Sequence, residues 1–309
     1  MASPENMPAI HHRLSPFIRL PLALLTLTFC LSAKATAAND IASIDWTLAE
    51  TLVALDQPPT AVAQVNDYHD WVGEPRLPDD VTDLGLRSQP NMERLAKLSP
   101  QHVLISPMFS HLAPRLERIA PVETFSLYSP GQDTWTEMLD LTRALGELVE
   151  RPDAAEALIA STESRLETLR ERLPDDSRPL LIVQFMDARH VRVFGENGLF
   201  QAVMDRLGLE NAWQEETNAW GFSLVGLERL VELDAQLVVV EPYPTGVEEK
   251  LRHSALWQHQ SSVRDDTLIT IPPTWSFGAL PSAQRFAELI VPALARSEQS
   301  RHIRHHTDS

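Results

Sequence analysis

A chain of 309 residues, 43% of them hydrophobic, is long enough for one large or two smaller domains with a buried core. Its net charge of −17 comes without a basic stripe, which argues against nucleic acid or an anionic membrane surface as a partner. The single cysteine, Cys30, lies in an N-terminal apolar run, so the rest of the chain needs no disulfide.

The first 37 residues have the pattern of a secretory signal peptide. Basic residues precede the apolar run 20–31, and small residues follow at Ala35 and Ala37, so we expect cleavage near Ala37. The run is too short to span a membrane, and the bulky Phe29 before Cys30 does not suit lipid attachment. An exported, cysteine-free chain of this size is typical of the bacterial periplasm.

The rest of the chain alternates strand patterns with helical patterns. Apolar runs bounded by Pro, Asp or Gly predict strands at 59–65, 102–106, 179–185, 190–194, 235–241 and 267–271, after a first strand that ends just before Trp46. Amphipathic patterns predict helices at 46–56, 91–98 and 199–208. This alternation indicates an α/β fold with mainly parallel sheets.

Two helical segments without a strand candidate, 134–150 and 152–173, occupy the middle of the chain. The second is long and charged, begins at Pro152 and ends at a proline- and aspartate-rich turn. Pattern alone leaves two interpretations open: a helix that joins two α/β halves, or an ordinary surface helix.

Motifs of the common enzyme classes are absent from the sequence. There is no glycine-rich phosphate loop, no H-E-x-x-H, and no close His or Cys spacing of the kind that holds a metal. Ser223, His190 and Asp187 supply the residue types of a hydrolase triad, but any chain of this length does so. We therefore expect a protein that is not an enzyme, with a periplasmic serine hydrolase as the remote alternative.

Tryptophans in loops are the strongest chemical signal. NAWQEETNAWG at 211–221 carries two of them in a stretch too polar for a core. Trp46, Trp71 and Trp275 each follow a predicted strand, where an open α/β sheet forms its ligand crevice. A single loop tryptophan usually packs under its loop, but several together predict a cleft for a bulky, partly apolar ligand.

Three segments resemble one family of binding proteins: DYHDWVGEPRLPDDVTDLGLRSQPNMERLAKLSPQHVLIS, HVRVFGENGLFQAVMDRLGLENAWQEETNAWG and PPTWSFGAL. They are similar to the periplasmic ferric-hydroxamate (ferrichrome-type) siderophore-binding proteins of ABC importers, whose fold is the helical-backbone class of substrate-binding proteins. The resemblance extends from about Ile41 to about Leu294. It implies two Rossmann-like α/β lobes joined by a single long helix, with the ligand cleft between the lobes.

After the signal peptide (1–37), the resemblance implies an N-terminal lobe (38–150), a linking helix (151–174) and a C-terminal lobe (175–300), followed by a tail (301–309). The ligand of the family is an iron(III) ion already wrapped by three hydroxamates. No cofactor and no metal ligand from the protein are therefore expected. The same fold with another iron chelate, haem or cobalamin is the alternative, although Arg87 is the only evident cation of the cleft.

The resemblance also implies the site residues. An arginine can donate two hydrogen bonds to the hydroxamate oxygens, and the family's arginine matches Arg87. Without the resemblance, Arg87 could merely pair with Asp83. The other implied ligand contacts are Trp46, Tyr68, Trp71, Phe109, Trp213, Asn218, Trp220, Trp275 and Phe277.

Phe109 replaces a tyrosine of the family, and Ser106 or Ser110 could supply the hydroxyl donor that is lost. For transport, the resemblance implies a monomer that docks on the permease of an inner-membrane ABC importer through one acidic residue on each lobe. Glu228 matches the C-terminal position, and Glu117 substitutes for Pro114 on the N-terminal lobe. Both glutamates could equally be ordinary helix-surface charges.

Overall fold

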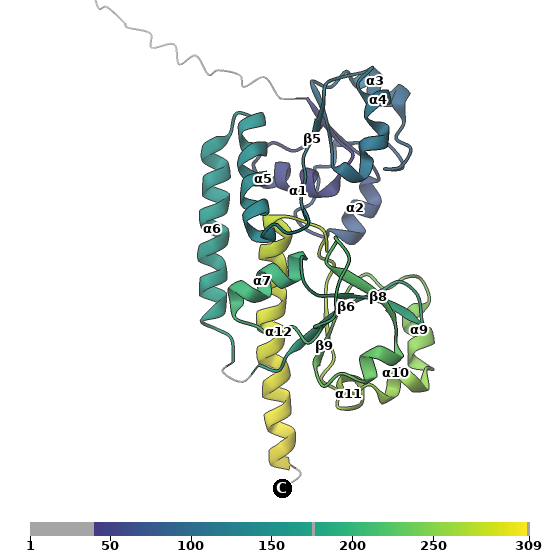
Figure 1. Cartoon of the computed structure of the whole chain (residues 1–309), viewed down its shortest axis with the longest axis vertical. Helices are drawn as coiled ribbons and strands as arrows, with labels where there is room; N and C mark the ends of the chain where they lie inside the picture. The colour runs from purple at the N-terminus through teal and green to yellow at the C-terminus, as the bar shows by residue number, and fades with distance from the viewer. Residues whose placement is uncertain (1–39, 175–176, 308–309) are drawn as a thin grey trace, which may run out of the picture. The chain divides into compact units, whose positions relative to one another are not determined.

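The computed structural model describes residues 40–174 and 177–307, with residues 300–307 described by their backbone alone. The predicted signal peptide and its cleavage site at Ala37 lie outside the described residues. Within the described part, two five-stranded sheets are joined through helices (Figure 1). The predicted α/β fold with two lobes is confirmed.

The N-terminal lobe is built on a wholly parallel sheet with the order β3-β2-β1-β4-β5. Its strands are β1 (Ile41–Ser43), β2 (Ala61–Val62), β3 (Thr82–Asp83), β4 (His102–Ile105) and β5 (Val122–Thr124). Its helices are α1 (Trp46–Ala54), α2 (Val65–Trp71), α3 (Met92–Leu98), η1 (Pro107–Leu112) and α4 (Ala113–Leu116). Because all strands are parallel, their carboxyl ends meet at one edge of the sheet.

The C-terminal lobe has a mixed sheet with the order β10-β9-β6-β7-β8. β10, β9 and β6 are parallel, whereas β7 is antiparallel to both β6 and β8. The strands are β6 (Leu180–Phe185), β7 (His190–Phe194), β8 (Phe222–Gly226), β9 (Gln236–Val240) and β10 (Ile269–Ile271). The helices are α7 (Leu199–Leu207), α8 (Glu228–Val231), α9 (Val247–Arg252), α10 (Ala255–His259) and α11 (Ser261–Arg264).

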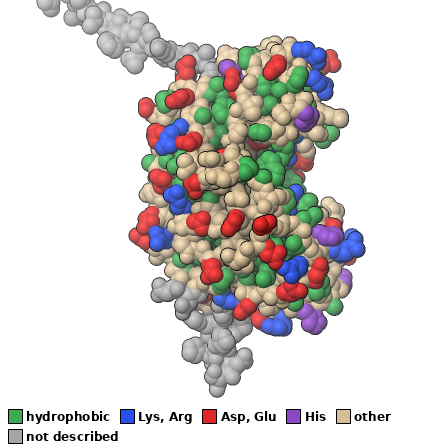
Figure 2. All heavy atoms as spheres, in the orientation of Figure 1, with side chains coloured by type: hydrophobic (Ala, Val, Ile, Leu, Met, Phe, Trp, Pro, Cys, Tyr) green, Lys and Arg blue, Asp and Glu red, His purple; other side chains and the backbone are tan. Residues whose placement is uncertain are grey.

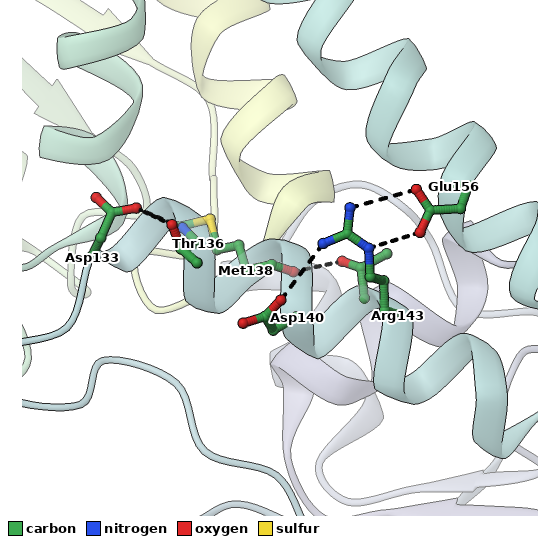
Figure 3. A network of polar contacts seen from close by, with 7 residues as sticks. Asp133, Thr136, Met138, Asp140, Arg143 and Glu156 are labelled. Carbon is green, nitrogen blue, oxygen red and sulfur yellow. Dashed lines mark hydrogen bonds and ion pairs between the residues drawn. The ribbon is translucent and has the colours of Figure 1, made fainter.

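Between the two sheets the chain forms α5 (Thr134–Leu148) and α6 (Pro152–Arg170), which pack on each other. Asp133 caps α5 by accepting a hydrogen bond of 2.8 Å from the backbone N of Thr136. Arg143 on α5 lies 3.6 Å from Asp140 and 2.7 Å from Glu156 on α6 (Figure 3). These ion pairs are exposed, so the buried apolar face of α5 contributes more than they do to this packing.

The last helix, α12 (Leu280–Thr307), was not predicted. Pro292 lies inside it, and an interior proline in a sequence normally indicates a helix end. It packs along α6 and α7 and also contacts α1 and α5 (Figure 1). The expected frayed tail 301–309 is helical as far as Thr307, since no Gly or Pro follows Pro292 in this stretch. The exact boundaries of the lobes stay a prediction.

A buried carboxyl group ties α1 to the start of α12. Glu50 has no solvent exposure, and its two oxygens accept hydrogen bonds from the backbone N of Ala279 (2.7 Å) and from Ser282 Oγ (2.5 Å). Nearby, Thr47 Oγ1 donates to the carbonyl of Phe277 at 2.8 Å. Burial raises the pKa of Glu50 to about 8, because water is replaced by apolar surroundings.

Candidate ligand-binding site

A cavity of about 550 Å³ lies between the two lobes and receives side chains from both. In the space-filling view the molecule is hollowed on its right side, between α2 and β8, with hydrophobic side chains at the margin (Figure 2). Its volume falls within the usual range for small-molecule sites. The chain thus forms the cleft that the loop tryptophans predicted.

The N-terminal wall of the cavity comes from the carboxyl ends of parallel strands. Each of the five strands is followed, within a few residues, by a lining side chain: Asp45 and Trp46 after β1, Gln64 after β2, Arg87 after β3, Ser106 after β4, and residues 125–130 after β5. This is the edge at which open α/β sheets bind ligands.

Arg87 is the central polar group of this wall. Its guanidinium carbon lies 3.7 Å from the ring centroid of Trp46 and 5.5 Å from that of Trp275. Its Nε atom is buried and has no hydrogen-bond partner among the residues that the structure describes. The alternative pairing with Asp83 does not occur, because the Asp83 carboxylate accepts from the backbone N of Gly85 and forms no ion pair with Arg87. The aromatic faces hold the cation in place and leave donor capacity for a ligand.

The electrostatics around Arg87 are mixed. Burial lowers the pKa of Arg87 by removing water from the cation, while Asp45 and Asp67 oppose this shift. Both carboxylates also line the cavity. Asp45 accepts from the backbone N of Thr47 as the N-cap of α1, and Asp67 accepts from Gln64. The charge of Arg87 therefore has compensating carboxylates in its own lobe.

Ser106 offers a second donor on the same wall. It lines the cavity, and its buried Oγ has no hydrogen-bond partner within the described part of the chain. Ser110, the other candidate to replace the hydroxyl missing at Phe109, is exposed and does not line the cavity. The structure thus favours Ser106.

The aromatic rings of the cavity form a continuous row from one lobe to the other. Successive ring centroids lie 5.0 Å apart for Trp46 and Trp275, 5.2 Å for Trp275 and Phe277, and 5.9 Å for Phe277 and Trp220. All three pairs meet edge to face, a preferred aromatic geometry. The buried Nε1 atoms are satisfied, Trp46 by Ala63 O and Trp275 by Thr47 Oγ1.

The polar loop 211–221 presents one of its tryptophans and buries the other. Asn218 Oδ1 accepts from the backbone N atoms of Trp220 (2.9 Å) and Phe222 (3.3 Å), which fixes the turn. Gly221 has a φ of +73°, and a Cβ there would come within 2.5 Å of the Gly198 Cα. Trp220 consequently reaches the cavity, while Trp213 packs against the other face of the C-terminal sheet.

Six of the ten predicted ligand-contacting residues line the cavity: Trp46, Trp71, Arg87, Trp220, Trp275 and Phe277. The other four, Tyr68, Phe109, Trp213 and Asn218, do not. Tyr68 is fully buried and donates its hydroxyl to Pro75 O, and Phe109 is buried beside Arg87, 5.7 Å from its guanidinium carbon. Trp213 is also buried, and Asn218 supports the turn at Trp220. A ligand contact by these four stays a prediction.

Arg192 is a lining residue that the sequence analysis missed, so the expectation that Arg87 is the only cation of the cleft is wrong. It lies on β7 between Val191 and Val193, both fully buried on the opposite face of the strand. The alternation in HVRVF already indicated that Arg192 faces away from that core. The sequence pattern did not indicate that the face of β7 that carries Arg192 borders the cavity.

The hydrolase triad is not assembled. His190 Nδ1 lies 3.0 Å from an Asp187 oxygen, but Ser223 pairs in register with Val193, three residues further along β7. Ser223 Oγ instead donates to Glu216 O. Three strand residues correspond to about 10 Å, too far for a nucleophile and its base.

Across the described residues, no three His, Cys, Asp or Glu side chains are placed to hold a metal ion. No helix in that part of the chain combines the length and apolarity that a membrane span requires. The two predicted docking residues are exposed: Glu228 begins α8, and Glu117 follows α4.

Residues 41–274 match the model of the periplasmic binding protein family, and the chain belongs to this family. Among its relatives is the iron(3+)-hydroxamate-binding protein FhuD of Escherichia coli, 34% identical over 260 residues that cover 84% of this chain and 88% of that protein. The homologues are substrate-binding proteins and not enzymes.

Solved structures share the fold. The siderophore-binding protein FhuD of Vibrio cholerae, crystallised with iron(III)-Desferal, matches with a TM-score of 0.80 and 24% identity over 84% of this chain and 99% of that one. The triscatecholate siderophore-binding protein FeuA of Bacillus subtilis matches with a TM-score of 0.69 and 18% identity over 84% and 93%. These two proteins bind different chelates, so the fold alone does not select the ligand.

Proposed function

We propose that this protein captures iron(III)-hydroxamate siderophores in the cavity between its lobes and delivers them to an inner-membrane ABC importer. The family and the relative named as an iron(3+)-hydroxamate-binding protein support this assignment. We also propose that the chain acts in the periplasm as a monomer, after cleavage of its signal peptide near Ala37.

One observation carries the proposal: an aromatic cavity whose two free donors lie on one wall. Neither the buried Nε of Arg87 nor the buried Oγ of Ser106 has a hydrogen-bond partner in residues 40–174 and 177–307, and both residues line the cavity. A buried donor without an acceptor costs free energy, so the site suits a ligand that brings acceptor oxygens. The oxygens of an iron-bound hydroxamate carry partial negative charge, and the rest of such a ligand is apolar enough for the tryptophan row.

A fluorescence titration tests the ligand class. Trp46, Trp220 and Trp275 line the cavity, so a bound iron complex that absorbs light should quench their emission. We expect saturable quenching by a ferric trishydroxamate and weaker binding of the iron-free molecule, which lacks the preformed shape. Binding of a ferric triscatecholate or haem without any response to hydroxamates would refute the assignment.

A second experiment tests docking. Glu228→Gln and Glu117→Gln remove exposed charges outside the cavity, so they should leave siderophore affinity unchanged. In vesicles that contain the permease, we expect each to reduce iron uptake. Full uptake by the double variant would show that these glutamates are ordinary surface charges.

A further inference from the structure

The second cation of the cavity, Arg192, has an unusual setting. Its guanidinium carbon lies 5.1 Å from the ring centroid of Phe222 and 5.6 Å from that of Phe277. Among the described residues, its guanidinium makes one hydrogen bond, a long one of 3.4 Å, to the neutral Oε1 of Gln184 on the adjacent strand. Gln184 is itself buried and shares this oxygen with Ser276. Arg192 is therefore held by aromatic faces and one amide.

Arg192 also lacks a counter-charge. Throughout the described part of the chain, no carboxylate lies within ion-pair distance of it. Arg87 forms no ion pair within the described residues either, but Asp45 and Asp67 line the cavity on its side and oppose the effect of burial on its pKa. Burial lowers the pKa of Arg192 without such an opposing carboxylate. A partly buried cation that the protein leaves unpaired is costly, and an anion from outside would relieve the cost.

The difference between Arg87, which has carboxylates on its side of the cavity, and Arg192, which has none among the described lining residues, bears on the charge of the ligand. In a ferric trishydroxamate, three deprotonated hydroxamates balance iron(III), so the complex itself is uncharged. Of the described residues that line the cavity, two on the Arg87 side are carboxylates and none on the Arg192 side is. We propose that Arg192 makes the protein select iron(III) chelates that carry a carboxylate or another anionic group on their periphery. The inference rests on the proposed function and names the ligand class within it.

A matched set of probes isolates the charge. Desferal has one free amine outside its iron-binding groups, so its ferric complex is a cation. Acetylation of the amine makes it neutral, and succinylation adds a carboxylate, without any change at the iron. Each is titrated against the wild-type protein by tryptophan quenching, at low and high salt.

We expect wild type to bind the succinylated probe about ten- to hundredfold more tightly than the acetylated one, as for a hydrogen bond to a charged group. Added salt should reduce this preference. In Arg192→Gln the preference should fall to near one, and in Arg192→Lys it should be partly kept. Arg189→Gln removes the same charge from an exposed position three residues away and should keep the full preference.

The outcomes separate the two proposals. If the neutral and cationic complexes bind wild type as tightly as the succinylated probe, the charge selection is refuted while the hydroxamate assignment stands. The same holds if Arg189→Gln alters the preference as much as Arg192→Gln does. If no ferric hydroxamate binds wild type at all, the proposed function fails, and the selection fails with it. The order of affinities of the wild-type protein for the probes requires no variant, so it tests the charge selection even if Arg192→Gln does not fold.

Discussion

Replacement of Arg87 tests the binding model most directly. Arg87→Ala removes a guanidinium whose carbon lies 3.7 Å from the Trp46 ring centroid and whose Nε has no hydrogen-bond partner in the described chain. The bound ligand would lose a hydrogen bond to a charged donor, worth about 1.5–3 kcal/mol, so affinity should fall roughly ten- to hundredfold. Arg87→Lys should also weaken binding, because an ammonium cannot reproduce the planar fork.

The same variant should hardly change stability. Loss of the cation–π contact costs up to about 2 kcal/mol, but removal of an unpaired buried donor relieves a penalty of about 1–3 kcal/mol. Affinity is measured by fluorescence titration and stability by urea denaturation, with wild type in parallel. An affinity within about twofold of wild type, the effect of a weak exposed contact, would refute the role of Arg87. A large loss of stability would instead identify Arg87 as a structural residue.

Four further results are expected. Ser106→Ala should lower siderophore affinity by about 0.5–3 kcal/mol, measured by the same titration, and unchanged affinity would remove Ser106 from the site. Trp213→Ala should lower the free energy of unfolding by about 3–5 kcal/mol and leave the siderophore affinity of the folded protein unchanged. Trp220→Ala should lower siderophore affinity more than it lowers stability. The reverse pattern would contradict the loop structure. The pKa of Glu50 rises from 4.5 in the unfolded chain to about 8 in the folded protein. The stability that the protonated carboxyl group contributes is therefore fully present below pH 4.5 and is lost as the pH rises to about 8. Over this range the free energy of unfolding of wild type should fall by on the order of 1 kcal/mol per pH unit relative to Glu50→Gln, as measured by urea denaturation. Equal slopes would show that Glu50 is ionised in the folded state. Finally, the packed α5, α6 and α12 should limit closure, so a clear decrease of the radius of gyration on ligand binding, measured by solution scattering, would contradict a stiff joint.

The sequence predicted the long core strands because burial on both faces leaves an unbroken apolar run, as in β6 and β9. It missed β3, which has only two residues, and neither of them is buried. It missed α12 because an interior proline such as Pro292 normally indicates a helix end. In the structure, one face of α12 is buried in the core, and the helix continues past Pro292. Prediction from local sequence pattern is least accurate for elements that are stabilised by contacts with residues far away in the sequence.

The cleft shows the same limit. The residues that follow the strands were found because sheet topology places them together, as with Trp46, Arg87 and Trp275. Trp213 and Trp220 look alike in the sequence, yet only Trp220 lines the cavity. What separates them is the close approach of Gly221 to Gly198 and the hydrogen bonds of Asn218, none of which composition or periodicity reveals.

The tie between α1 and the start of α12 has a consequence for how the protein folds. Thr47 Oγ1 donates to the carbonyl of a residue 230 positions later, and the described hydrogen-bond donors to Glu50 are Ala279 and Ser282. A ribosome or a translocation channel releases the chain from its N-terminal end, so the first helix emerges long before these partners. Until Ala279 and Ser282 have been released, the Glu50 carboxyl group on α1 lacks the hydrogen-bond partners that it has in the folded protein. Contacts this distant in sequence make folding slow and postpone the last step of the N-terminal lobe until nearly the whole chain is free.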